Sequence, residues 1–265
     1  MSTQNPDELT RYEQDTWDRC ASKYVDGFGA LVGESIPSLL DAAGVTSGAR
    51  VLDIGSGPGL VAAAAQQRGA DAMGIDFAES MVREARRRYP NIEFHHGNAE
   101  SLPFENEAFD AVVSNFVLHH MARPDVVLRE ARRVLRDGRR VAFTVWSERS
   151  KLEGFGLFLS AIEEHAYLRE LPHGPLFGVA DFDVLGDLLR AAGFRDTSVS
   201  DLDVTWHIRS IDTFIEAFCA WAGMEAYPQA AREAIEQSVR QRAAALAPDG
   251  ILKLPNPAIL LTGIK

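Results

Sequence analysis

A glycine-rich turn between two apolar runs constrains the fold of this chain more than any other feature of its sequence. The run 51–54 leads into three closely spaced glycines, and the run 73–75 ends at an aspartate. A strand, a glycine turn and a helix in this order form the crevice in which parallel sheets bind nucleosides, and an acid ending the second strand holds the ribose. We therefore expect an α/β fold that binds an adenosine-containing cofactor. The expected binding residues here are Asp53, Gly55, Ser56, Gly57, Gly59 and Asp76.

The spacing of these glycines separates two classes of cofactor. A dinucleotide site needs the pattern Gly-x-Gly-x-x-Gly, because its pyrophosphate rests on the helix N-terminus. Here Gly55, Gly57 and Gly59 alternate with single residues. Asp53 stands two positions before the first glycine, where a carboxylate repels a phosphate and suits a ligand with an ammonium group. S-adenosylmethionine carries an ammonium group and a ribose but no phosphate, so it is the cofactor that we expect.

On these residues the chain resembles the class I S-adenosylmethionine-dependent methyltransferases, most closely their small-molecule, quinone-biosynthesis-like subgroup. The resemblance extends over about residues 50–146 and includes the segment 97–104. In the family an Asp of that segment usually accepts a hydrogen bond from the adenine amine. This chain has Asn98 there, whose amide oxygen can also accept. The resemblance implies further cofactor contacts from Phe77, Met81, Ala99, Glu100, Ser114, Asn115 and Phe116.

Apolar and turn patterns predict alternating strands and helices in the first half of the chain. Such alternation implies a parallel sheet with right-handed crossovers. The expected strands span about 50–55, 71–76, 92–96, 111–115 and 140–146, and the helices between them span 60–68, 78–89 and 125–135.

Beyond residue 146 the alternation breaks, and helical patterns dominate. The resemblance implies that two late strands form an antiparallel hairpin at the sheet edge. The fold class expected is then α/β, with a Rossmann-like, seven-stranded, mostly parallel sheet and helices on both faces. Helices are expected at about 151–171, 181–192, 212–223 and 228–246, a turn at 172–175, and strands at 197–206 and 258–264.

We expect residues 1–265 to form a single methyltransferase domain. Two N-terminal helices, about 6–25 and 34–43, would cover the cofactor site, so the segment 1–48 precedes a cofactor-binding core at 49–147. The resemblance implies that insertions after the fifth and sixth strands form a helical cap over the carboxyl end of the sheet. These insertions are 148–180 and 209–250.

The chemistry expected of the chain is alignment of an acceptor with the cofactor's methyl carbon and exclusion of water. An acceptor hydroxyl or acidic carbon also benefits from a general base. His120 and His119, just past the fourth strand, are the general bases that we would test first, and His173 is next. A structural or cofactor-packing role is the competing interpretation of His119 and His120.

Two groups of aromatic residues also allow two interpretations. Tyr12, Trp17 and Tyr24 recur at helical spacing and form either a lid over the cofactor or plain core. The second group lies in the expected cap and either lines an apolar pocket or serves helix packing. Its members are Phe155, Phe158, Phe177, Phe214, Phe218 and Trp221.

Composition narrows the expected partners. The net charge of −11 disfavours nucleic acid and anionic membranes, which attract basic surfaces. The basic run Arg86–Arg88 ends a predicted helix, where cations favour the dipole. Cys20 and Cys219 lack metal-ligand spacing, so we expect no metal and two reduced thiols in a cytoplasmic protein. No signal-peptide core and no apolar run of membrane-spanning length is evident.

The leading functional prediction is direct SN2 transfer of a methyl group to a small, apolar or aromatic metabolite, leaving S-adenosylhomocysteine. One alternative is a protein that binds the cofactor without transferring methyl. A weaker alternative is methylation of a macromolecule, since the segment after the fourth strand, Ser114–Val117, lacks the Pro-Pro of nucleic-acid amino-methylating enzymes. The acceptor atom and the oligomeric state stay open.

Overall fold

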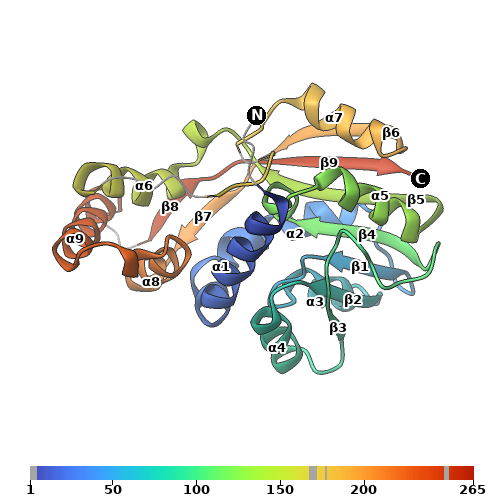
Figure 1. Cartoon of the computed structure of the whole chain (residues 1–265), viewed down its shortest axis with the longest axis horizontal. Coiled ribbons are helices and arrows are strands. Elements are labelled where there is room, and N and C mark those ends of the chain that lie inside the picture. The colour runs from blue at the N-terminus through green and yellow to red at the C-terminus, as the bar shows by residue number, and fades with distance from the viewer. Residues whose placement is uncertain (1–4, 167–171, 177, 248–250) are drawn as a thin grey trace.

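Seven strands of the described chain form one twisted sheet (Figure 1). The computed structural model describes residues 5–166, 172–176, 178–247 and 251–265. The order of the strands is β3-β2-β1-β4-β5-β9-β6. Strands β1 to β5 run parallel to one another, whereas β9 is antiparallel to both β5 and β6. Their bounds are β1 Arg50–Ile54, β2 Asp71–Asp76, β3 Glu93–His96, β4 Phe109–Asn115, β5 Leu135–Trp146, β6 Arg195–Leu202 and β9 Ala258–Ile264.

Helices cover both faces of this sheet, as predicted. Side chains of β1 alternate between the faces, so Val51 packs in the cluster of α2, α3 and α4, while Leu52 packs in the cluster of α5 and α7. These clusters are the core of the fold and hold the strand ends in place. The helices are α2 Gly29–Ala42, α3 Leu60–Gln67, α4 Glu79–Arg88, α5 Pro124–Val134 and α7 Phe182–Ala191.

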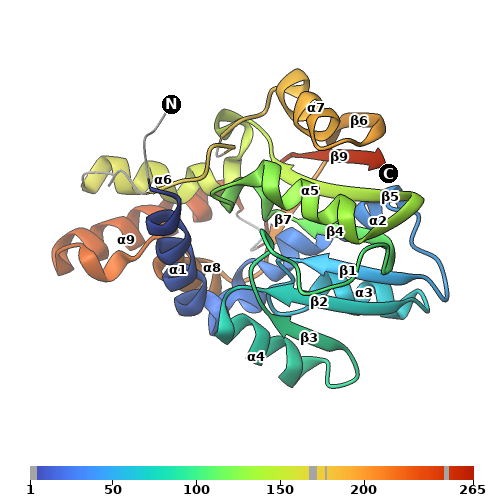
Figure 2. The ribbon, with the colours of Figure 1, turned by 45° about the vertical axis from the view of Figure 1, so that its right-hand side comes forward.

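The chain runs outward from β1 to β2 and β3 and then returns to place β4 on the other side of β1. The strand order therefore reverses beside β1, and open α/β sheets form their binding crevice at that point, outside the carboxyl ends of the strands. Helix α1, Pro6–Gly27, lies beside these ends (Figures 1 and 2). Its start is well defined, because the Asn5 side chain accepts a hydrogen bond from the Asp7 amide and Pro6 occupies the first turn.

A second group of helices packs beside α1, away from the sheet (Figure 1). Its core is aromatic: Phe158, Trp206, Phe214 and Phe218 are all buried there, and the Phe158 and Phe218 rings stack with centroids 4.8 Å apart. We call this group the helical lobe. It comprises α6 Glu153–His165, α8 Ile211–Trp221, α9 Gln229–Leu246 and a two-stranded antiparallel sheet of β7 Thr205–Ile208 and β8 Leu252–Pro255. Short 3-10 turns span Leu118–His120, Arg149–Lys151 and Met224–Ala226.

The prediction of one strand over 197–206 is wrong. The chain leaves the main sheet after β6 and enters the helical lobe with β7, because Val204, Trp206 and Ile208 bury their side chains in the core of that lobe. The partner strand β8 was not predicted. Strands β6 and β9 do pair antiparallel at the sheet edge, but they are not a hairpin, since α8, α9, β7 and β8 lie between them in sequence.

Other boundaries differ by a few residues. Helix α2 begins at Gly29 rather than 34. Strand β5 begins at Leu135, which pairs with Phe109 of β4, rather than at 140. Within this strand Gly138 has a left-handed backbone, with φ of 74°, as is common in turns. Helix α6 ends at His165 and Ala166 has an extended backbone, while residues 167–171 of the expected helix lie outside the described residues, as does Phe177.

Candidate functional site

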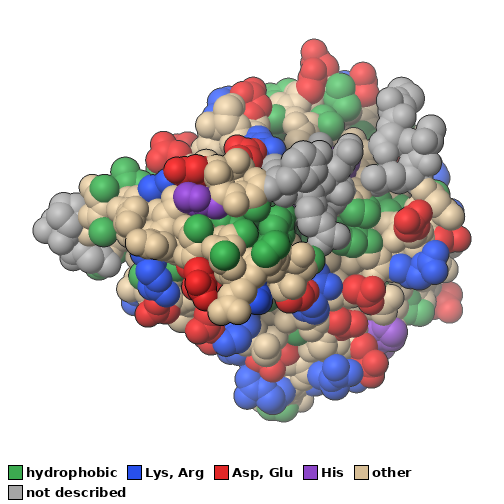
Figure 3. All heavy atoms as spheres, turned by 60° about the vertical axis from the view of Figure 1, so that its left-hand side comes forward, with side chains coloured by type: hydrophobic (Ala, Val, Ile, Leu, Met, Phe, Trp, Pro, Cys, Tyr) green, Lys and Arg blue, Asp and Glu red, His purple; other side chains and the backbone are tan. Residues whose placement is uncertain are grey.

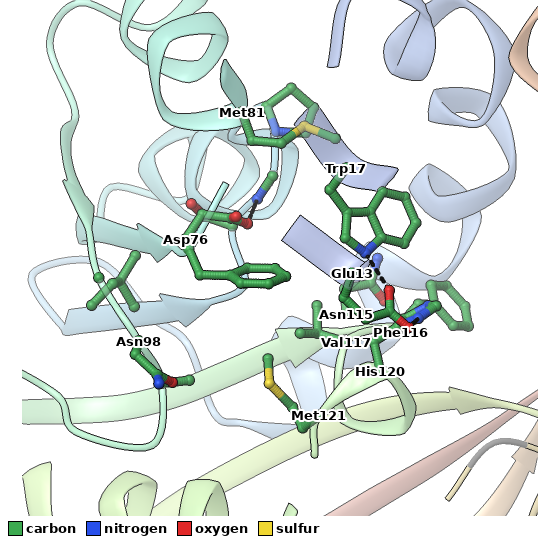
Figure 4. Close-up of a pocket in the computed structure, with 18 of the residues that line it drawn as sticks. Glu13, Trp17, Asp76, Met81, Asn98, Asn115, Phe116, Val117, His120 and Met121 are labelled. Atoms are coloured by element: carbon green, nitrogen blue, oxygen red, sulfur yellow. Dashed lines mark hydrogen bonds and ion pairs between the residues drawn. The ribbon is translucent and has the colours of Figure 1, made fainter. Parts of the chain in front are cut away.

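One pocket lies at the carboxyl ends of β1, β2 and β4 (Figure 4). Its walls come from the glycine turn after β1, the end of β2, the loops after β3 and β4, and helix α1. The empty space inside, open mouth included, is about 960 Å³. The crevice predicted from strand order is therefore a real cavity.

The glycine turn gives the pocket its floor. Gly55, Gly57 and Gly59 all have left-handed backbones, with φ of 67°, 50° and 88°. A Cβ on Gly55 would lie 2.5 Å from the Val117 side chain, and one on Gly59 would lie 2.7 Å from the Phe94 ring. Gly57 differs, because a Cβ there would meet no described protein atom within 4 Å although the residue lines the pocket. The outer glycines thus serve close packing, and Gly57 leaves room for a ligand.

Asp76 ends β2 inside the pocket. Its carboxylate accepts hydrogen bonds from the backbone N–H of Gly57 and of Ala78, each over 2.8 Å. Burial raises the pKa of Asp76 to about 6, and the two hydrogen bonds offset part of that shift. Each carboxylate oxygen keeps a further lone pair, so the side chain can also accept from ribose hydroxyls.

Asp53 lies behind the turn and does not line the pocket. Its Oδ2 accepts from the Ala62 amide over 3.2 Å, while Oδ1 has no hydrogen-bond partner among the described residues. Burial raises the pKa of Asp53 well above its usual value, and the nearby Asp76 raises it further. The Ser56 hydroxyl, which does line the pocket, also lacks a partner in the described part of the chain. Of these two residues only Ser56 belongs to the pocket wall, so a ligand with hydrogen-bonding groups of its own, such as the expected cofactor, fits beside its hydroxyl.

The loop after β3 forms the wall expected to meet adenine. Asn98 lines the pocket together with Gly97, Ala99 and Glu100. The Asn98 Oδ1 accepts from the Glu100 amide over 2.9 Å, which fixes the orientation of the side chain and leaves one lone pair of that oxygen. Glu100 in turn accepts from the backbone and the guanidinium of Arg123, so the loop is anchored to the start of α5.

Of the three residues expected from the end of β4, two reach the pocket. Ser114 does not, because its hydroxyl donates to the Ile54 carbonyl and ties β4 to β1. Asn115 lines the pocket, but its amide is bonded to protein on both sides, with Oδ1 accepting from Ser35 and Thr144 and Nδ2 donating to the Val32 carbonyl. Asn115 therefore holds α2 against the sheet.

Phe116 adopts an uncommon backbone conformation for a large side chain, with φ of 59°. Its ring stacks on Trp146 with centroids 3.7 Å apart, and its amide donates to the Thr144 hydroxyl. Strain of this kind persists where surrounding contacts hold it in place and gathers at functional sites. The aromatic face of Phe116 is thereby kept in the pocket wall.

A contact between α1 and the loop after β4 was missed by sequence reasoning. Glu13, buried on α1, accepts from Trp17 Nε1 over 3.0 Å and lies 3.1 Å from His120 Nδ1. The Trp17 and His120 rings meet edge to face, with centroids 5.1 Å apart. All three residues line the pocket (Figure 4). The available signal was the four-residue spacing of Glu13 and Trp17, which puts both on one helix face.

The other two histidines proposed as bases lie elsewhere. His119 is buried outside the pocket, and neither ring nitrogen has a hydrogen-bond partner among the described residues. Burial, with a smaller effect from His120, lowers the pKa of His119 well below its usual value, so the ring is neutral. His173 is exposed and does not line the pocket.

The aromatic residues divide between the two interpretations. Trp17 and Tyr24 line the pocket, as do Phe77 and Met81, whereas Tyr12 does not. Burial, together with the acids Asp76 and Asp53, raises the pKa of Tyr24, so its phenol stays protonated near neutral pH. None of the described aromatic residues expected in the cap lines the pocket, and they pack the helical lobe instead: Phe155, Phe158, Phe214, Phe218 and Trp221.

Comparisons with known proteins agree with this geometry. A family model described as methyltransferase domain matches residues 52–143. The chain is 34% identical over 134 residues to the demethylmenaquinone methyltransferase of Renibacterium salmoninarum, covering 51% of this chain and 54% of that protein. It is also 34% identical over 181 residues to the protein of that name from Beutenbergia cavernae, covering 62% and 72%. The chain thus spans about half the length of one relative and nearly three quarters of the other.

A solved structure supports the fold. The YcgJ protein of Bacillus subtilis matches with a TM-score of 0.56 at 22% identity, covering 87% of this chain and 97% of that one. Within the described residues, no helix is long and apolar enough to cross a membrane, and no group of three or more His, Cys, Asp or Glu side chains is arranged to hold a metal ion.

Proposed function

This chain belongs to the class I S-adenosylmethionine-dependent methyltransferases, and from that premise we propose that it methylates a small acceptor that is apolar or aromatic and carries no negative charge. The bound cofactor supplies a methyl group on a positively charged sulfur, which is already an activated electrophile. The protein's task is to orient the acceptor and exclude water.

Residues of the pocket suit each part of the cofactor. Asp76 would accept from the ribose hydroxyls and Asn98 from the adenine amine. Gly57 leaves space for the amino-acid part of the cofactor, and Ser56, whose buried hydroxyl has no partner among the described residues, lines the pocket next to it. Phe77, Met81, Ala99 and Glu100 also line the pocket.

The observation that carries the acceptor class is the lining of the rest of the pocket. No Lys or Arg belongs to the wall within the described chain, whereas Glu13, Asp76 and Glu100 do. A carboxylate or phosphate on the acceptor would meet these acids without a cation to pair with. Apart from Thr10, Asn115 and His120, most of the remaining wall is apolar or aromatic and comes from Trp17, Tyr24, Val32, Leu60, Phe116, Val117 and Met121.

The name of the relatives supports this class of acceptor, since demethylmenaquinone is a quinone. Surface charge argues against a nucleic-acid substrate. On the face in Figure 3, Lys and Arg side chains of the described residues lie between Asp and Glu side chains and form no continuous stripe. The net charge of −11 points the same way.

We also propose how the chain is organised around the site. Residues 1–265 would act as one methyltransferase domain, in which 1–48 cover the cofactor and the insertions 148–180 and 209–250 form a cap. Both cysteines are free thiols, which suits a reducing compartment such as the cytoplasm.

The test uses methyl-labelled S-adenosylmethionine with four probes of one ring system: 1-naphthol, 1,4-naphthalenediol, 1-naphthylamine and 1-naphthoic acid. We expect label in a neutral probe and none in the carboxylate. Label only in added protein or RNA would favour macromolecule methylation, and binding of S-adenosylhomocysteine without transfer would favour a non-methylating protein. Either result would overturn the proposal. Binding of NADH with no binding of S-adenosylhomocysteine would overturn it too.

A further inference from the structure

We propose that Glu13 and Trp17 hold His120 as the general base for an acceptor hydroxyl, so that the acceptor class is a phenol or alcohol and the product an O-methyl ether. This inference rests on the proposed methyl transfer and specifies the acceptor atom. His120 is the catalytic residue, whereas Glu13 and Trp17 are positioning residues that act through it.

The hydrogen bonds around Glu13 fix the tautomer of His120. An indole N–H can only donate, so Trp17 Nε1 donates to Glu13 Oε2. Glu13 Oε1 lies 3.1 Å from His120 Nδ1. A carboxylate has no hydrogen to give, so Nδ1 carries the proton and donates it to Glu13. The other ring nitrogen, Nε2, is then a lone-pair acceptor.

Nε2 of His120 is open to the pocket. It has no protein hydrogen-bond partner among the described residues. It is also not one of the fully buried side-chain nitrogens, so a ligand can reach it. The side chain is 12% exposed and belongs to the pocket wall. The neighbouring His119 offers no such nitrogen, since both of its ring nitrogens are buried away from the pocket.

Glu13, Trp17 and His120 also lie in the part of the cavity that we assign to the acceptor. In Figure 4, Asp76 and Asn98 lie on one side of the pocket, whereas Glu13 and His120 lie on the opposite side with Trp17 and Phe116. An aromatic ring held against Trp17 or Phe116 would bring its substituent close to His120.

The step balances without any further reactant. As the acceptor oxygen bonds to the methyl carbon and the carbon–sulfur bond breaks, the hydroxyl proton passes to His120 Nε2. The positive charge leaves the sulfur and appears on the imidazole, facing the Glu13 carboxylate, whose side chain is only 7% exposed. A neighbouring carboxylate stabilises an imidazolium, and the proton then leaves to solvent.

The first test compares the variants Glu13→Gln and His120→Ala with 1-naphthol and 1-naphthylamine as probes. A general base contributes about 10² to 10⁴ in rate. We expect His120→Ala to lower kcat for 1-naphthol by that factor and Glu13→Gln by about tenfold or more, with the KM for S-adenosylmethionine unchanged. Transfer to the amine, whose lone pair attacks before any proton leaves, should fall far less. Glu8→Gln, at an exposed position of the same helix, is the matched control.

The second test reads the tautomer directly by ¹⁵N NMR of the His120 ring and needs no turnover. We expect Nδ1–H in the wild type. In Glu13→Gln the amide oxygen must face the Trp17 donor, which turns the amide N–H₂ toward Nδ1 and forces the proton onto Nε2. This reversal would leave no base in the pocket, and a purely structural role of Glu13 would not require it.

The outcomes separate the two proposals. If the wild type methylates no probe, the proposed function fails. If it methylates the amine but not the naphthol, or if either variant keeps the wild-type kcat for the naphthol, methyl transfer stands and the general-base unit is overturned. An Nε2–H tautomer in the wild type would also overturn it.

Discussion

The backbone N–H of Gly57 donates a hydrogen bond to the Asp76 carboxylate over 2.8 Å, so the glycine turn and the end of β2 are joined directly. The glycine turn and Asp76, which we propose bind the cofactor, therefore share one electrostatic environment. Because that environment is buried, the charge of Asp76 depends on pH within a range accessible to experiment.

Affinity for the cofactor product is expected to fall in mild acid. The pKa of Asp76 is raised to about 6 by burial, and only the ionised carboxylate has all its lone pairs available to ribose hydroxyls. Calorimetry with S-adenosylhomocysteine should show affinity that is level above pH 7 and falls about tenfold per unit below pH 6. The variant Asp76→Asn should bind weakly with no such slope between pH 5 and 7. An equal slope in both proteins would assign the titration to another group.

Whereas acid lowers the affinity for the cofactor product, protonation of Asp76 in acid should increase the stability of the ligand-free protein. Its folded pKa of about 6 lies above the reference value of 3.8, so between these values the native state binds more protons than the unfolded state. The contribution is therefore fully present below about pH 4 and is lost as pH rises through 6, with an upper bound of about 3 kcal/mol. The measurement is the free energy of unfolding in denaturant for the wild type and Asp76→Asn, at pH 4 and at pH 7. The wild type should lose stability relative to the variant between pH 4 and pH 7.

Gly138 serves as a control for Gly57, because alanine at either position strains the backbone but only alanine at Gly57 takes up space in the pocket. Gly57 and Gly138 both have left-handed backbones, and a Cβ on either would meet no described atom within 4 Å, but only Gly57 lines the pocket. Alanine at either position should cost about 1–2 kcal/mol of stability. Only Gly57→Ala should weaken S-adenosylhomocysteine binding, by tenfold or more in calorimetry. Similar affinities in the two variants would place the cofactor elsewhere.

Local patterns predicted the strands and helices of the first half of the sheet well, because their signals are short in sequence. The glycine turn, Asp76 and the segment around Asn98 each combine residue type with position at a strand end. The cofactor contacts expected from Ser114 and Asn115 follow less directly from sequence, because both side chains form hydrogen bonds within the protein. Such competition between partners is visible only in three dimensions.

Long-range contacts explain what the sequence did not predict. Glu13 and His120 are 107 residues apart and meet because α1 lies across the strand ends. The break between β6 and β7 depends on Trp206, which is drawn into the aromatic core of the helical lobe. An alternating pattern over 197–206 fits one strand equally well, and only the tertiary packing decides between the two.

Asn98→Asp should tighten binding through the adenine amine. Asn98 Oδ1 is held in place by the Glu100 amide, and an ionised acceptor forms a hydrogen bond about twice as strong as a neutral one. We expect a gain of about threefold to tenfold in affinity for S-adenosylhomocysteine. S-inosylhomocysteine, which lacks the amine, should show no gain. A gain for both ligands would mean that the introduced carboxylate acts on the loop rather than on adenine.

Acid should destabilise the native state through His119. Its folded pKa lies well below 6.5 because of burial and the neighbouring His120, so below pH 6.5 the unfolded state takes up a proton that the native state does not. This contribution to stability is present above pH 6.5 and is lost progressively as pH falls, opposite in sign to that of Asp76. His119→Leu removes it and also removes two unpartnered ring nitrogens. The variant should match the wild type within about 1 kcal/mol at pH 7 and become the more stable of the two as pH falls toward 5 in denaturant unfolding. A difference between the two proteins that stays constant from pH 7 to 5 would show that the native state accommodates a charged His119.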